Sequence, residues 1–208
     1  MVNREELDNY CNNFLNVKNF KDYGPNGLQI EGSETINKIV SGVSANLDLI
    51  ERAIEEKADA IFVHHGIFWE NESNLITGAK RKKIALLINN NINLFGYHLP
   101  LDDHPEVGNN IELGRILGIK KMKPVEDSYL WQGELKTDLK SFSSLIEREL
   151  GRAPQLFGEM KKSINKIAWC TGGAQGFIDE AIKLKVDLFL SGEVSERTPA
   201  SAKENGIT

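Results

Sequence analysis

Residues 38–65 read KIVSGVSANLDLIERAIEEKADAIFVHH, and this stretch decides the fold class. The run at residues 38–43 is rich in β-branched side chains, which is typical of a buried strand. Apolar side chains then recur at helical spacing over residues 47–57, and a second short apolar run follows at 60–63. A strand, a helix and another strand in this order predict a βαβ unit with parallel strands.

The same pattern occurs a second time along the chain. Residues 38–65 align without a gap with residues 166–193, and seven of the 28 aligned positions are identical. Because the strand–helix–strand pattern is preserved as well, an internal duplication is favoured over chance. We therefore predict an α/β fold of two similar three-layer lobes with mainly parallel sheets. The lobes are expected at residues 1–124 and 125–208, joined near residues 124–131.

Composition narrows the class of protein. The 208 residues are 40% hydrophobic and 26% charged, and 25 basic against 30 acidic side chains give a net charge of −5. A mildly acidic chain disfavours general binding to nucleic acid. The two distant cysteines, Cys11 and Cys170, predict reduced core thiols rather than a disulfide framework. No signal-peptide segment and no run near the roughly 18 apolar residues of a membrane helix occur, so we expect a soluble cytoplasmic protein.

Two adjacent histidines, His64 and His65, follow the second predicted strand. Neutral imidazole is the commonest protein ligand for zinc-like metals. Neighbouring strand residues normally point to opposite faces, but Gly66 permits a turn that directs both rings to one pocket. Ligands bind at the carboxyl ends of strands in open α/β sheets, which favours a metal site here. The alternative is one buried histidine bonded to the backbone and one exposed histidine.

A second polar cluster follows the next predicted strand, at residues 92–97, and contains His98, Asp102, Asp103, His104 and Glu106. Because neighbouring parallel strands stand roughly 5 Å apart, one carboxylate here can share a metal ion with the two histidines. The alternative is a polar loop in which an aspartate caps the helix that starts near Asn109.

Three further features have a functional and a structural interpretation. By the repeat, Glu193 falls on His65, so it is a candidate proton-transfer group or a helix cap. The glycine-rich residues 171–176 resemble a phosphate-binding loop only weakly, and a tight turn is the simpler interpretation. The basic run at residues 80–83 is a solvated helix face or, as an alternative, a phosphate-binding surface.

At these residues the chain resembles the Nif-three-like family, whose bacterial members are often called GTP cyclohydrolase 1 type 2 homologues. The resemblance spans nearly the whole chain, and its motifs occur in the same order. They are Tyr23-Gly24-Pro25-Asn26-Gly27-Leu28-Gln29, Val63-His64-His65-Gly66, Tyr97-His98-Leu99-Pro100-Leu101-Asp102, Trp169-Cys170-Thr171-Gly172-Gly173 and Ser191-Gly192-Glu193-Val194-Ser195-Glu196.

The resemblance implies a two-lobed subunit, a ring-shaped homohexamer and a centre of two divalent metal ions. It places metal ligands at His64, His65 and Asp102. Their mixed nitrogen and oxygen donors suit iron, manganese, zinc or nickel.

The resemblance also implies a hydrolase that opens the imidazole ring of GTP, a small-molecule substrate, and releases formate. His98 or Glu193 would then move protons. One alternative is a non-enzymatic metal-binding protein, such as a metal carrier or an assembly partner. Another is a ring that binds nucleic acid through residues 80–83, which the acidic net charge disfavours.

The family's two remaining ligands lie in a late Gly-His-His-Ala-Thr-Glu motif, which would follow Thr208. His64, His65 and Asp102 supply three groups, enough for one open site. We therefore expect residues 1–208 to hold fewer than two ions per subunit. Elemental analysis of this chain beside a version extended by the family's C-terminal segment tests this, and two tightly bound ions in residues 1–208 would contradict it.

Overall fold

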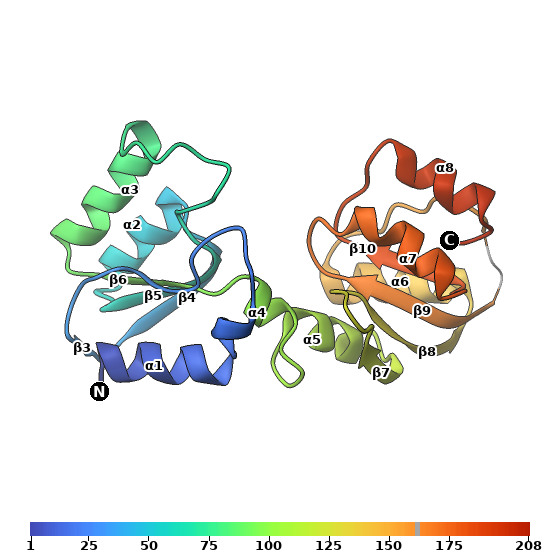
Figure 1. The fold of residues 1–208 in the computed structure, drawn as a ribbon, viewed down its shortest axis with the longest axis horizontal. Coiled ribbons are helices and arrows are strands. Elements are labelled where there is room, and N and C mark those ends of the chain that lie inside the picture. Colours follow the sequence, from blue (N-terminus) through green and yellow to red (C-terminus); the bar gives the residue numbers. More distant parts are fainter. Residues whose placement is uncertain (161–162) are drawn as a thin grey trace. The chain divides into compact units, whose positions relative to one another are not determined.

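Each half of the chain folds around a four-stranded sheet with helices on both faces (Figure 1). The computed structural model describes residues 1–160 and 163–208. It divides into two compact units, Met1–Leu101 and Asp102–Thr208. No helix among the described residues is long and apolar enough to cross a membrane.

The first unit contains the repeated strand–helix–strand segment close to the predicted bounds. Its elements are β1 (Val2–Asn3), α1 (Arg4–Phe14), the 3₁₀ helix η1 (Val17–Asn19), β2 (Gly27–Ile30), β3 (Thr35–Ile36), β4 (Ile39–Ser44), α2 (Leu47–Glu55), β5 (Ala60–His65), α3 (Gly78–Asn89), β6 (Asn93–Gly96) and α4 (Leu99–Asp102), which ends at the first residue of the second unit. The main sheet has the order β2-β6-β5-β4, in which β6, β5 and β4 are parallel and β2 is antiparallel. The predicted parallel arrangement is therefore confirmed in this unit.

Residues 60–63 of β5 are apolar because both faces of the strand are covered there. Ile61 and Val63 pack into the core beneath α2 and α3, which contains Ile50 and Leu87. Ala60 belongs to the core on the opposite face, where α1 packs (Figure 1). The strand ends at His64 and His65, and the two cores fix its position in the sheet.

The second unit contains α5 (Asn109–Ile116), β7 (Lys120–Pro124), β8 (Trp131–Thr137), α6 (Leu139–Leu150), β9 (Ile164–Cys170), the 3₁₀ helix η2 (Gln175–Phe177), α7 (Ile178–Lys183), β10 (Leu188–Ser191) and α8 (Arg197–Glu204). Its sheet has the order β10-β9-β8-β7. Among these described strands only the β9–β10 pair is parallel, and the β8–β9 and β7–β8 pairs are antiparallel. The expectation of a mainly parallel sheet does not hold here, because the short loop after β7 returns β8 antiparallel beside it.

The two units share the duplicated segment down to its strand register. Ile39 pairs with Ala60 in the first unit, and Ile167 pairs with Leu188 in the second, both at parallel strands. Lys57 and Lys185, at equivalent positions, both have φ of 54°. The predicted duplication is therefore supported by backbone geometry as well as by sequence.

One carboxylate clamp occurs in both copies of the repeat. Asp59 Oδ2 accepts hydrogen bonds from the backbone N–H groups of Asn37 and Lys38, at 2.7 and 2.9 Å. Asp187 Oδ2 accepts the equivalent two bonds from Asn165 and Lys166, at 2.9 and 3.0 Å. Each clamp ties the start of one parallel strand to the chain that enters the next.

The boundary between the units differs from the predicted one. It lies between Leu101 and Asp102 rather than after Pro124. Ile111 of α5 belongs to the same core as Trp169, and β7 pairs with β8, so the segment after Leu101 belongs to the second unit. Asp102, which was expected in the first lobe, therefore falls in the second.

Both cysteines pack as expected for core thiols. Cys11 is half-buried against the α1 core, and Cys170 is buried in the second unit. Burial raises the pKa of the Cys11 thiol and raises that of Cys170 to about 12.

Removing either clamp should destabilise the fold. We expect Asp59→Ala and Asp187→Ala each to lower the free energy of unfolding by about 1–2 kcal/mol, because each leaves two backbone donors without their acceptor. Urea denaturation of each variant measures the change. Asp59→Asn, which retains one side-chain oxygen, is the matched control and should cost less. A neutral effect at either aspartate would show that the two clamps are not equivalent.

Candidate metal centre

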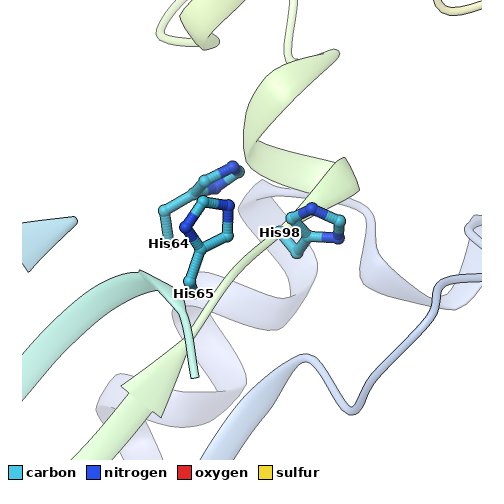
Figure 2. A group of neighbouring side chains, drawn as sticks. All are labelled: His64, His65 and His98. Atoms are coloured by element: carbon cyan, nitrogen blue, oxygen red, sulfur yellow. The ribbon is translucent and has the colours of Figure 1, made fainter. Parts of the chain in front are cut away.

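Three histidine rings gather at the carboxyl ends of β5 and β6 (Figure 2). His64 and His65 end β5, and His98 follows β6 by two residues. One nitrogen of each ring can act as a metal ligand, and these three atoms lie within 4.8 Å of one another. The ring centroids of His64 and His65 are 4.5 Å apart, and those of His64 and His98 are 4.9 Å apart. The predicted convergence of the two adjacent histidines is present, and a third ring joins them.

The side chains of His64 and His65 meet at the point where β5 has separated from β6 but still pairs with β4. Its pairing with β6 ends at Val63, while its pairing with β4 continues to His65. The Nδ1 atom of His64 lies 2.9 Å from the carbonyl oxygen of Tyr97, on the β6 side. The Nδ1 atom of His65 lies 3.1 Å from the hydroxyl of Ser44, on the β4 side. The two rings are thus held from opposite sides.

The bond to Tyr97 also assigns the proton on His64. A carbonyl oxygen only accepts, so His64 must carry its hydrogen on Nδ1, and Nε2 then carries the lone pair that a metal ion needs. Partners of this kind, which hold the other ring nitrogen, are typical of metal-binding histidines.

His98 is oriented by a carboxylate that the sequence did not single out. Its Nδ1 lies 2.7 Å from Oδ1 of Asp22, whose side chain is only 2% exposed. Asp22 Oδ2 also accepts from the Asn26 amide and from the Leu99 backbone N–H, each at 2.9 Å. Burial alone would raise the pKa of Asp22, but the hydrogen bonds from His98, Asn26 and Leu99 outweigh burial and lower it. Asp22 is therefore a carboxylate that fixes the proton of His98 on Nδ1.

Strand β2, which follows the loop that carries Asp22, contacts the ends of both strands that lead to the histidines, β5 and β6. Gln29 accepts a hydrogen bond from the Ile67 backbone N–H at 3.0 Å, and its amide lies against Gly66 and Gly96. A Cβ atom at Gly66 would stand 2.1 Å from the Gln29 side chain, and one at Gly96 would stand 2.6 Å from it. Gly66 was expected to permit a turn. In the structure, it is needed for this close approach.

Trp69 forms an aromatic wall beside the rings. Its indole centroid lies 5.1 Å from that of His98, edge to face, and 5.9 Å from that of His65. Trp69 is half-buried, whereas Trp131 and Trp169 are only 2% and 0% exposed. Pro25 and Trp69 lie with His64 and His98 around one tightly packed pocket.

The acidic residues after His98, Asp102 and Asp103, belong to the second unit. Within that unit, Asp102 Oδ1 accepts hydrogen bonds from the side chains of Asn109 and Thr171. Asp103 accepts from the Trp131 indole at 3.3 Å, and burial is the main cause that raises its pKa. The alternative interpretation, an aspartate that caps α5, is not what the structure shows, because Gly108 holds the cap position without a side-chain bond. His104 Nδ1 instead accepts from the backbone N–H groups of the two residues after Pro105.

Glu193 and the basic run have local partners. Glu193 is exposed, and its carboxylate lies beside Gly173 of the glycine-rich segment. Lys80 donates to the Ser73 carbonyl at 3.0 Å and lies 5.2 Å from the centre of the Phe68 ring. These contacts give Lys80 a role within the protein itself.

The comparisons with known proteins agree with this architecture. A model of the Duf34/NIF3 (NGG1p interacting factor 3) family matches residues 2–208. The chain belongs to this family. Over 205 residues it is 48% identical to the "GTP cyclohydrolase 1 type 2 homolog" of Escherichia coli K12, covering 97% of this chain and 83% of that protein.

Solved structures give the same result. The fold matches one described as "protein ybgI, unknown function", with a TM-score of 0.95 and 45% identity over 99% of this chain and 84% of that one. It also matches the protein TTHA1606 of Thermus thermophilus, with a TM-score of 0.91 and 30% identity over 99% and 84% of the two chains. Family membership and the α/β fold are therefore established.

A metal ion at the histidine cluster should be detectable through Trp69. We expect Ni²⁺ to quench the fluorescence of Trp69 strongly and Zn²⁺, with its filled d shell, to quench it weakly. A fluorescence titration with each ion measures the two effects. Trp69→Phe is the control, because the two buried tryptophans that remain should not respond. Equal quenching in Trp69→Phe would place the ion elsewhere.

Proposed function

We propose that this protein is a divalent-metal-dependent hydrolase that acts on a small molecule, with GTP as the first substrate to test. The observation that carries the proposal is the set of three imidazoles whose Nδ1 atoms each have a hydrogen-bonding partner and whose ligand nitrogens lie within 4.8 Å of one another. The GTP component rests on the printed name of the relatives.

The residues present fit a divalent metal ion. Imidazole nitrogen suits zinc, nickel and iron, and an added carboxylate extends the choice to manganese. When bound, such an ion supplies Lewis-acid activation of water near neutral pH. We assign His64 and His65 as ligands, because the groups that hold their Nδ1 atoms are an uncharged carbonyl and an uncharged hydroxyl. These partners favour the neutral imidazole that binds metal.

Asp102 is our proposed carboxylate ligand. Support comes from the sequence resemblance and from its position at the end of α4, the helix that begins directly after His98. The two-ion centre and the ring-shaped homohexamer that the resemblance implies belong to the same proposal. Sedimentation of the purified protein measures the oligomeric state.

His98 is the group that we propose moves a proton. Asp22 fixes the hydrogen of its ring on Nδ1, so Nε2 is the atom that can accept a proton from water or donate one to a leaving group. The Asp22 carboxylate also stabilises the ring when it is charged, as the carboxylate does in acid–base dyads. Glu193 is the second candidate for this task.

Formate release from GTP tests the hydrolase. The metal-loaded protein should release formate, and a chelator should abolish the release. His64→Ala should lose metal and turnover together. His98→Gln keeps a polar side chain opposite Asp22 but cannot exchange a proton, so it should retain metal and lose about 10²–10⁴-fold in rate.

Two results would contradict parts of this proposal. Tight metal binding without GTP turnover would reject the hydrolase and favour a non-enzymatic metal-binding protein. Loss of metal from His98→Gln would make His98 a ligand rather than the proton-transfer group.

A further inference from the structure

The motif Trp169-Cys170-Thr171-Gly172-Gly173 has no role in the function proposed above. It begins in the buried end of β9 and continues into the turn that precedes η2. The hydroxyl of Thr171 donates a hydrogen bond to Oδ1 of Asp102, at 3.2 Å. The side-chain amide of Asn109 donates to the same oxygen, at 2.8 Å. Two donors from separate elements of the second unit therefore converge on one carboxylate oxygen.

Thr171 is itself held rigidly. Its backbone N–H donates to Oδ1 of Asn110 at 2.8 Å, and Asn110 is fully buried. The indole N–H of Trp169 donates to the backbone carbonyl of Asn110, also at 2.8 Å. The buried end of β9 is thus fastened to the first turn of α5, which also carries Asn109. A displacement of Thr171 would break its backbone bond to Asn110 and its hydroxyl bond to Asp102 together, so its hydroxyl has a fixed position.

The glycines after Thr171 serve the turn. Gly172 has φ of +70°, and its carbonyl accepts from the backbone N–H groups of Ala174 and Gly192, at 2.9 and 3.0 Å. The carbonyl is thus used within the protein, and the carboxylate of Glu193 lies beside Gly173. A negative charge at this position opposes an anion, so the segment is a poor phosphate-binding loop.

The duplication shows that the fold does not require the Thr171 hydroxyl. At the offset that aligns residues 38–65 with 166–193, Thr171 falls on Val43, a β-branched residue of nearly the same shape without a hydroxyl. Val43 lies in β4, the equivalent of β9. The hydroxyl is therefore specific to the copy that contacts Asp102.

We propose that Thr171 is a positioning residue for Asp102 and acts together with Asn109. Both donors bond Oδ1, so they hold the Asp102 carboxylate in one orientation for binding the metal ion. This inference rests on the proposed function, in which Asp102 is a metal ligand. Partners that orient a ligand in this way typically contribute about 10–100-fold to metal affinity.

Metal affinity of the full chain tests the proposal. Titration of metal-free protein with Co²⁺, followed by visible absorption, gives the affinity without reference to activity. Thr171→Val removes the hydroxyl at nearly constant shape and should weaken binding by about 10–100-fold. Thr171→Ser keeps the hydroxyl donor and should retain most of the affinity. If only the Thr171 methyl group mattered, Thr171→Ser would lose the affinity instead.

The matched control is Thr198→Val, in the same unit. Thr198 is buried, and its hydroxyl lies 2.9 Å from that of Ser195 rather than at Asp102. This variant should keep the wild-type affinity even if its melting temperature falls. If Thr171→Val does not fold, Asn109→Ala removes the other donor to Asp102 and should likewise weaken Co²⁺ binding by about 10–100-fold.

Asp102→Asn separates this inference from the proposed function. If Asp102→Asn binds Co²⁺ as well as the wild type, Asp102 is not a ligand and the ligand assignment fails. Two results would overturn only the positioning role of Thr171. In the first, Asp102→Asn binds Co²⁺ weakly but Thr171→Val binds it as the wild type does. In the second, Thr171→Ser binds Co²⁺ as weakly as Thr171→Val does.

Discussion

The hydrogen bonds made by the Nδ1 atoms of three histidines are the constraint on which the candidate centre depends. Successive residues of a regular strand present their side chains to opposite faces. The Tyr97 carbonyl, the Ser44 hydroxyl and the Asp22 carboxylate each hold one Nδ1. The rings thereby gather with one nitrogen of each within 4.8 Å of the others. A site arranged in this way loses little conformational entropy when it binds a metal ion.

The duplication explains how such a site can arise on a stable scaffold. Both copies keep the strand register and the aspartate clamp, which maintain the fold. They differ at the strand ends, where His64-His65 in one copy corresponds to Gly192-Glu193 in the other. The positions of the candidate centre thus differ between the two copies, while the positions that support the sheet are shared.

Much of this arrangement could be predicted from the sequence, because its signals are local. The apolar run before His64 and the repeat in residues 166–193 predicted the strand–helix–strand units. The role of Asp22 could not be predicted, since it lies 76 residues from His98 in a loop without periodicity. The observed unit boundary also differs from the predicted one, because the loop between β7 and β8 resembles a linker in sequence although these two strands pair in one sheet.

The central claim is that His64 and His65 bind a divalent ion through their Nε2 atoms. X-ray absorption fine structure of the zinc-loaded protein tests it most directly. We predict nitrogen ligands at about 2.0–2.1 Å with the outer-shell scattering of imidazole. That scattering should disappear in the double variant His64→Ala, His65→Ala. A zinc shell made only of oxygen or sulfur, or imidazole scattering that persists in the double variant, would contradict the claim.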